Sequence, residues 1–134
     1  MAVEAEISSV LAKLFWSLDH QQAQPVESCW SEAGRLQIWP FEGDPVLLQG
    51  RASIMAYCQQ FWTGTASPMR HLLAAVTIDK ATAQCASARF YCHYIRVGEE
   101  PVIVGMGEYR NQFMHKEGSW KIVDSELRFL APLV

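Results

Sequence analysis

The chain has 134 residues, of which half are hydrophobic and 19% are charged, and its formal net charge is −3. This composition is typical of one globular domain with a substantial core and excludes a disordered chain. The acidic balance and the scattered Lys and Arg residues argue against nucleic acid and anionic membranes as partners. The N-terminus is acidic and no apolar run is long enough to span a bilayer, so we expect a soluble, cytoplasmic protein.

The four cysteines, Cys29, Cys58, Cys85 and Cys92, show no CxxC spacing. Cys85 and Cys92 would face opposite sides of one strand, so they cannot pair with each other. We expect buried free thiols, as in a reducing compartment. The four histidines are dispersed, and there is no phosphate-binding glycine loop, so the sequence predicts no metal site and no cofactor.

The first predicted element is a helix over residues 3–19, because apolar residues recur at helical spacing. Ile7, Leu11, Phe15 and Asp19 follow one another at intervals of four, so they lie on one ridge of this helix. If the ridge faces the core, Asp19 is carried inward, where a carboxylate needs a partner or a raised pKa. The alternative is an exposed aspartate at a fraying helix end.

Shorter elements follow, separated by turn residues. Pro25 suits the first turn of a short helix, and Gly34 ends that region. Two short strands on either side of a Pro- and Gly-rich turn predict a hairpin, and a second long helix leads into a loop. The predicted ranges are 25–30 for the short helix, 35–39 and 46–49 for the strands, 40–45 for the turn, 50–62 for the second long helix and 63–68 for the loop.

From residue 69 onward the hydrophobic period becomes that of strands. Four long strands are predicted at 69–79, 82–97, 101–115 and 119–130, with hairpin residues between them. Consecutive antiparallel strands of this length must twist and curl. We therefore predict one α+β domain over residues 1–134, in which a curved antiparallel or mixed sheet wraps around the N-terminal helices as a cone-shaped α+β barrel.

Several segments together resemble the SnoaL-like branch of the nuclear transport factor 2 superfamily: Leu18-Asp19, residues 48–54, Arg70-His71, residues 107–113 and residues 118–122. The resemblance covers nearly the whole chain and implies the cone-shaped fold of ketosteroid isomerase and scytalone dehydratase, often as a homodimer. A second acidic residue usually follows the first in this family, where this chain has Gln21-Gln22. A His-Arg pair often ends the last strand, where this chain has Asp124-Ser125.

His71 is the first catalytic candidate, because an imidazole titrates near pH ~6.5 and can act as acid or base. By strand alternation, Leu73 and Ala75 would share its face and form an apolar wall. In the dehydratase-like members that this chain resembles, a histidine here works with an aspartate of the first helix, and Asp19 matches it. A carboxylate would orient the imidazole and increase its basicity. The alternative is a structural histidine.

Asp124 is the second catalytic candidate. Trp120, Ile122 and Asp124 share one face of the last strand, and Trp120 is expected in the core, which places Asp124 on the cavity side. Cyclases and isomerases of the resembling family use a carboxylate in an apolar cavity as a base, and a raised pKa suits that role. A solvent-exposed carboxylate at the rim is the alternative.

On the strand at 82–97, the residues with even numbers from Ala86 to Tyr94 are predicted to face inward. Arg89, Tyr91 and His93 then lie on the convex face, unless a β-bulge exchanges the two faces. A convex face that carries Tyr and Arg fits a homodimer interface.

Six residues are candidates for contact with a substrate, although core packing is the alternative for the aromatic ones. They are Tyr57, Trp62, Leu73, Phe90, Asn111 and Trp39. Tyr109 and Phe113 are predicted to be structural. The functional hypothesis is a cofactor-independent dehydratase, isomerase or cyclase that acts on a small hydrophobic carbonyl compound of polyketide, terpenoid or steroid-like type. The competing hypothesis is a non-catalytic binding module or dimeric scaffold of the same fold.

Overall fold

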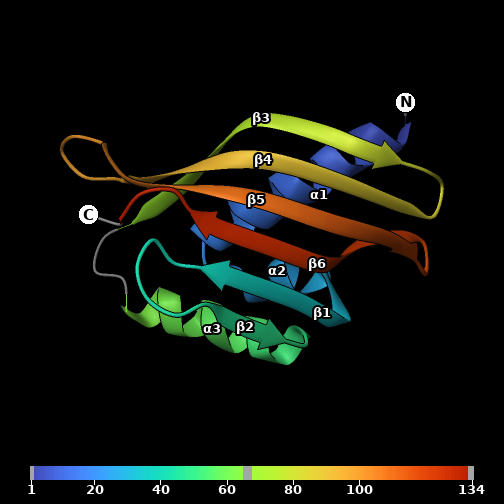
Figure 1. Ribbon diagram of the computed structural model, residues 1–134, viewed down its shortest axis with the longest axis horizontal. Coiled ribbons are helices and arrows are strands. Elements are labelled where there is room, and N and C mark those ends of the chain that lie inside the picture. The colour runs from blue at the N-terminus through green and yellow to red at the C-terminus, as the bar shows by residue number, and fades with distance from the viewer. Residues whose placement is uncertain (1, 65–67, 133–134) are drawn as a thin grey trace.

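The computed structural model describes residues 2–64 and 68–132, so residues 65–67 of the predicted loop lie outside it. Three helices and six strands follow one another along the chain (Figure 1). The helices are α1 (Ala2–Asp19), α2 (Ala23–Ser28) and α3 (Arg51–Gly64); the strands are β1 (Trp30–Trp39), β2 (Val46–Gln49), β3 (Met69–Ala81), β4 (Cys85–Arg96), β5 (Val102–Lys116) and β6 (Ser119–Phe129).

The six strands form one sheet in the order β2-β1-β6-β5-β4-β3. All neighbouring strands are antiparallel except β1 and β6, which are parallel. The sheet is open, with β2 and β3 at its edges, and the helices cover one of its faces (Figure 1). The predicted α+β class with a mixed sheet around the N-terminal helices is confirmed, and the cone remains open between its edges. No helix in the described ranges has the length and apolarity needed to cross a membrane.

The core lies between α1 and the covered face of the sheet. Ile7, Leu11 and Phe15, the apolar members of the predicted ridge, are all buried. They belong to one cluster with Phe113 and Ile122 from the last two strands. Burying a side chain of this size is worth about 1.5–3 kcal/mol, so this ridge stabilises the packing of α1 on the sheet.

Strand β1 begins earlier than predicted. Trp30 and Gly34, which we had placed in or after the short helix, both belong to this strand. The pairing of β1 with β6 shifts between Trp30 and Arg35, and a Cβ added at Gly34 would lie 2.9 Å from the carbonyl oxygen of Ser31. Gly34 therefore allows the backbone to pass close to Ser31 where the pairing of β1 with β6 is irregular, and it does not end a helix.

A β-bulge in β6 overturns the predicted orientation of Asp124. Phe113 pairs with Ile122, whereas the preceding Gln112 pairs with Asp124, so Val123 is an extra residue in β6. Ile122 and Ser125 are both buried, and Asp124 lies on the outer face of the sheet. One inserted residue moves the rest of a strand to the opposite face, which is why simple alternation from Trp120 fails here.

A second bulge breaks the alternation in β3. Ala74 pairs with Tyr91 and Thr77 pairs with Arg89, so two residues of β3 oppose one residue of β4. Ala75 lies in this bulge with a φ of 54° and is exposed. The predicted inward position of Ala75 was therefore wrong. Strand β4 itself alternates regularly, with Phe90 and the other even-numbered residues from Ala86 to Tyr94 buried, as predicted.

All four cysteines are free, as predicted, but only Cys29 and Cys92 are buried, whereas Cys58 and Cys85 are partly exposed. A hydrogen bond with the Thr82 hydroxyl lowers the pKa of Cys85, whereas burial raises the pKa of Cys58 to about 11 and that of Cys92 to about 12. Because the thiolate is the nucleophile, we expect a thiol-reactive disulfide reagent to label Cys85 first. The labelling rate should level off at a lower pH than for an ordinary thiol. A fast phase that survives Cys85→Ser would contradict this prediction.

Candidate functional site

An apolar cavity lies between α1, α3 and the covered face of the sheet. Its volume is about 120 Å³. Most of its wall is aliphatic or aromatic and comes from Leu14, Trp30, Leu36, Ile54, Leu127 and Phe129. The polar side chains in the wall are few and come mainly from the strands: His71, Tyr94, Tyr109, Asn111 and Ser125. A mostly apolar cavity with a few convergent polar groups is the usual form of a small-molecule site.

His71 and Asp19 form a close pair at the edge of this cavity. The Nδ1 atom of His71 lies 2.6 Å from Oδ1 of Asp19, and the backbone N–H of His71 also donates to both carboxylate oxygens, at 3.2 and 3.1 Å. Both side chains are largely buried, at 10% and 8% exposure. An ionised carboxylate only accepts hydrogen bonds, so the contact favours the neutral-ring tautomer in which Nδ1 carries the proton and Nε2 has the lone pair.

Aromatic rings hold the imidazole in place. The ring centroid of His71 lies 5.2 Å from that of Phe15 and 5.1 Å from that of Tyr94. Among the described residues, Nε2 has no hydrogen-bond partner, whereas the other ring nitrogen is bound to Asp19. The fold therefore presents one basic nitrogen whose ring is fixed by a carboxylate and by two aromatic neighbours.

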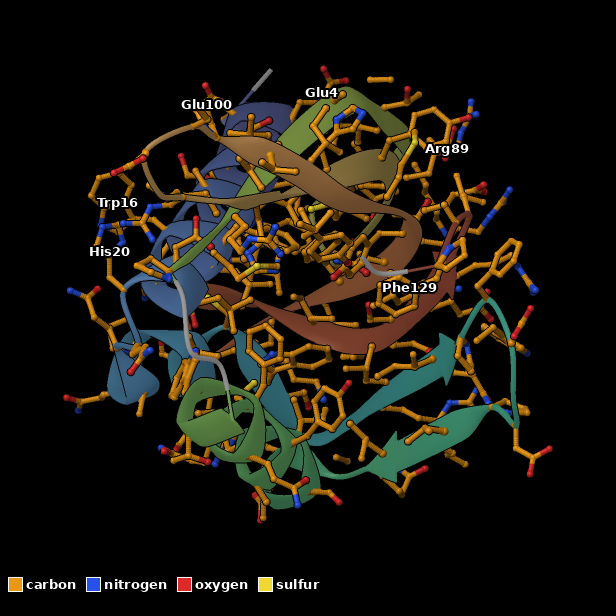
Figure 2. All side chains as sticks on the ribbon, turned by 90° about the vertical axis from the view of Figure 1, so that its left-hand side faces the viewer. Glu4, Trp16, His20, Arg89, Glu100 and Phe129 are labelled. Atoms are coloured by element: carbon orange, nitrogen blue, oxygen red, sulfur yellow. The ribbon has the colours of Figure 1, made fainter. Side chains whose placement is uncertain are left out.

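His71 also lines an outer hollow, here called the vestibule, which has a volume of about 440 Å³ and is more polar than the cavity. Asp19, His20 and Arg70 contribute polar groups to it. His20 lies at the end of α1, where its ring stacks on that of Trp16 (Figure 2). Leu18, Phe61, Trp62 and His71 line both the cavity and the vestibule.

Two tyrosines place hydroxyl groups in the cavity wall. The hydroxyl oxygens of Tyr94 and Tyr109 lie 3.1 Å apart. Burial raises the pKa of both phenols, so both are protonated at neutral pH, and one hydroxyl donates to the other. Gly107 makes room for this pair, because a Cβ at that position would lie 3.1 Å from the Tyr94 hydroxyl and 2.7 Å from a methyl group of Leu127.

The remaining polar pair of the cavity wall is Asn111 and Ser125, both buried. The Ser125 hydroxyl donates to Oδ1 of Asn111 at 2.5 Å. This bond satisfies the amide oxygen, so the amide NH₂ group is the part of Asn111 that remains to donate toward a bound molecule.

Of the six residues predicted to contact a substrate, Tyr57, Trp62 and Asn111 line the cavity. Leu73, Phe90 and Trp39 do not. Leu73 packs between the two core clusters, and Phe90 lies behind the wall, stacked on Tyr109 with ring centroids 5.0 Å apart. The guanidinium carbon of Arg128 lies over the Trp39 ring, 4.7 Å from the ring centroid.

Of the three predicted catalytic residues, Asp19 and His71 meet and Asp124 does not join them. Asp124 lies on the outer face, where its Oδ1 is 3.7 Å from Nε of Arg35. Prediction also missed Ser125 and favoured a structural role for Tyr109, whereas both residues line the cavity. The alternation of β4 predicted that Tyr94 faces inward. The inward position of Ser125, which pairs with Asn111 on β5, was not predicted because the bulge in β6 changes the face of the strand.

The sequence profile of the SnoaL-like domain family matches residues 1–126. The chain belongs to this family. In this chain the Asp19–His71 pair lies where the end of α1 meets the start of β3. No curated protein matches the sequence.

Solved structures of nuclear transport factor 2-like proteins share the fold of this SnoaL-like chain. One from Novosphingobium aromaticivorans has a TM-score of 0.83 at 22% identity, covering 96% of this chain and 82% of that one. ActVI-ORFA from Streptomyces coelicolor has a TM-score of 0.80 at 17% identity, covering 95% and 97%. A scytalone dehydratase-like protein from N. aromaticivorans has a TM-score of 0.78 at 18% identity, covering 96% and 84%. These identities establish the fold alone.

Metal ligands are not gathered anywhere in the described part of the chain: no three His, Cys, Asp or Glu side chains lie together as a metal site requires. The polar groups of the cavity wall include His71, which is paired with Asp19, and the hydroxyl and amide groups of Tyr94, Tyr109, Asn111 and Ser125.

Proposed function

We propose that this SnoaL-like protein is a cofactor-independent acid/base enzyme, a dehydratase, isomerase or cyclase, that acts on a small hydrophobic carbonyl compound. The observation that carries the proposal is the 2.6 Å contact between Asp19 and Nδ1 of His71 beside an apolar cavity. A carboxylate that fixes the tautomer of a histidine prepares the opposite nitrogen for proton transfer. The dehydratase-like name of one structural neighbour agrees with this reaction class.

In the proposed reaction, Nε2 of the neutral His71 ring takes a proton from the carbon next to a carbonyl group. The C–H electron pair moves onto the carbonyl oxygen, which becomes an enolate oxygen. In a dehydration, the imidazolium gives the proton to a hydroxyl on the neighbouring carbon, the enolate electrons form the C=C bond, and the C–O bond breaks to release water. In an isomerisation, the proton returns to a different carbon. Asp19 stabilises the imidazolium throughout.

The hydroxyl pair of Tyr94 and Tyr109 is the proposed partner of the enolate oxygen. Burial keeps both groups protonated, and one hydroxyl donates its hydrogen to the other, so the hydrogen of the second hydroxyl is left to donate to developing negative charge. Donors that are already in place inside an apolar cavity stabilise such charge more strongly than water does.

The experiment uses a simple probe of a base in an apolar cavity, the ring opening of nitrobenzisoxazole. Removal of its ring C–H proton sends the electron pair into a C≡N bond and breaks the N–O bond, which releases a coloured phenolate. We expect the wild-type protein to accelerate this reaction and His71→Gln to lose about 10²–10⁴ of the acceleration. His115→Gln, which changes an exposed histidine on β5, is the matched control. Equal rates for wild type and His71→Gln would refute the proposal.

A non-catalytic module that binds a hydrophobic ligand is the second candidate. The position of Asp124 outside the cavity favours it, because only one carboxylate then supports chemistry there. The two candidates differ in one result: a binding module takes up small apolar ligands in the cavity but leaves the nitrobenzisoxazole rate at its buffer value.

We further propose that the outer face of the sheet forms a homodimer interface. Leu72 is 55% exposed and Tyr91 is 39% exposed on neighbouring strands of this face. Arg89 projects outward from the same strand as Tyr91 (Figure 2). Exposed apolar side chains of this kind mark contact surfaces. Sedimentation velocity should give the mass of a dimer at micromolar concentration, and Leu72→Asp should yield a monomer. A monomeric wild-type protein would contradict the proposal.

A further inference from the structure

We infer that the ligand of this site has two parts, a single ring that fills the cavity and an anionic group, such as a carboxylate, that binds Arg70 in the vestibule. The inference names a substrate class for the proposed enzyme, and in that sense it rests on the proposed function. The binding geometry itself holds for an enzyme and for a binding module alike.

The size of the cavity indicates the first part of the ligand, the single ring. A dry apolar cavity of about 150 Å³ in another protein holds benzene, so the 120 Å³ here suits one ring and not a fused multi-ring system. The wall around it is aliphatic and aromatic, with Leu14 and Ile54 from the helices and Leu127 from β6. An apolar ring therefore fits both the volume and the chemistry of this cavity.

Arg70 indicates the second part of the ligand, the anionic group. One terminal nitrogen, Nη1, donates to the carbonyl oxygens of Met69 at 2.9 Å and Asp19 at 3.4 Å, which fixes the guanidinium group at the vestibule wall. The ion pairs found among the described residues do not include Arg70. The remaining N–H groups of a guanidinium held in this way form a planar fork that matches a carboxylate.

Neither of the other titratable side chains at the vestibule beside His71 is paired with the Arg70 guanidinium group. The Asp19 carboxylate accepts hydrogen bonds from the His71 ring and backbone, so its oxygens are directed to His71 and form no ion pair with Arg70. His20 is the other titratable side chain there, and its Nδ1–H donates to the carbonyl oxygen of Trp16 at 2.8 Å. The vestibule thus offers Arg70 as a fixed cation without a carboxylate partner in the described structure.

His71 links the two parts, because it lines both the cavity and the vestibule. A ligand with its ring in the cavity and its anionic group at Arg70 passes the His71 ring at the junction between them. The carbon that loses or gains a proton is therefore expected next to the ring, between the apolar and anionic parts of the molecule.

The experiment measures dissociation constants for phenylalkanoates of increasing chain length and for their neutral amides, by calorimetry or by NMR titration. The acid and the amide have the same shape, so their ratio isolates the charge. At the best chain length we expect the wild-type protein to prefer the acid by about tenfold, the scale of a hydrogen bond to a charged group. This comparison in the unmodified protein requires no variant. Equal affinities for acid and amide at every chain length would overturn the anion site.

Two pairs of variants assign the two parts. Arg70→Gln should remove the preference for the acid, whereas Arg110→Gln, which removes an exposed guanidinium from the outer face, should retain it. Cys58→Phe fills the cavity from α3 and should weaken acid and amide alike by about tenfold or more, whereas Cys58→Ser keeps the space and should not. A preference that survives Arg70→Gln, or undiminished binding in Cys58→Phe, would overturn the inference.

The outcomes separate this inference from the proposed function. His71→Gln should keep the preference for the acid, since Arg70 is unchanged, while losing the acceleration of the probe reaction. A wild-type protein that prefers the acid but does not accelerate the probe reaction would refute the enzyme and uphold the two-part ligand. A protein that accelerates the probe reaction without preferring the acid would uphold the enzyme and refute the two-part ligand.

Discussion

Replacing Asp19 by Asn is expected to lower the rate of the nitrobenzisoxazole reaction by about 10²–10⁴ while the fold survives. The carboxylate accepts hydrogen bonds from both Nδ1 and the backbone N–H of His71. An amide is neutral, and its NH₂ group can turn and donate to Nδ1. Nδ1 is then the unprotonated nitrogen and the ring proton lies on Nε2, so Nε2 can no longer act as the base. The same change of an orienting aspartate in Ser-His-Asp enzymes lowers kcat by about 10⁴.

Asp124→Asn is the matched control for Asp19→Asn, because both remove one carboxylate charge and change the side-chain volume equally. Asp124 lies on the outer face beside Arg35, so its replacement should leave the probe rate unchanged within about twofold. Thermal unfolding of both variants would exclude general loss of structure. A loss of rate in Asp124→Asn that equals the loss in Asp19→Asn would contradict the placement of the two carboxylates.

Phe113→Ala is expected to lower the free energy of unfolding by about 3–5 kcal/mol. The side chain is only 1% exposed and belongs to the cluster that joins the sheet to α1. It also pairs with Ile122 beside the bulge of β6, so the cavity left by the truncation lies where the strand changes face. Urea unfolding at equilibrium measures the loss, which amounts to a large share of the stability of a domain of this size.

Phe41→Ala serves as the control for Phe113→Ala, since it removes the same atoms from a side chain that is 52% exposed. Its effect should lie within about 0.5 kcal/mol of zero, as for most surface substitutions. A loss below about 1 kcal/mol in Phe113→Ala would mean that the sheet and α1 are not packed through this cluster.

Much of the fold could be predicted, because hydrophobic period and turn residues specify the long elements directly. The residues of β4 alternate regularly, and their buried and exposed faces were predicted correctly from Ala86 to Tyr94. Prediction failed where one residue is inserted. Val123 in β6 and Ala75 in β3 reverse the faces of their strands, and local composition does not mark either bulge.

The candidate site could be predicted in part for the same reason. The regular ridge of the first helix predicted an inward Asp19, and the family resemblance implied that Asp19 works with His71; neither residue lies beyond a bulge. Ser125 lies beyond the bulge of β6, so its contact with Asn111 could not be foreseen. The hydroxyl contact between Tyr94 and Tyr109 depends on the register between two strands, which the sequence of either strand leaves open.

The most direct test of the central claim is the tautomer of His71, read from the NMR shifts of its two ring nitrogens in the neutral imidazole. The short contact of Asp19 with Nδ1 predicts a protonated Nδ1 and an unprotonated Nε2 in the wild-type protein, and loss of this preference in Asp19→Asn. A neutral His71 ring that carries its proton on Nε2 would contradict the account, because the nitrogen assigned to take the substrate proton would then have no lone pair with which to do so.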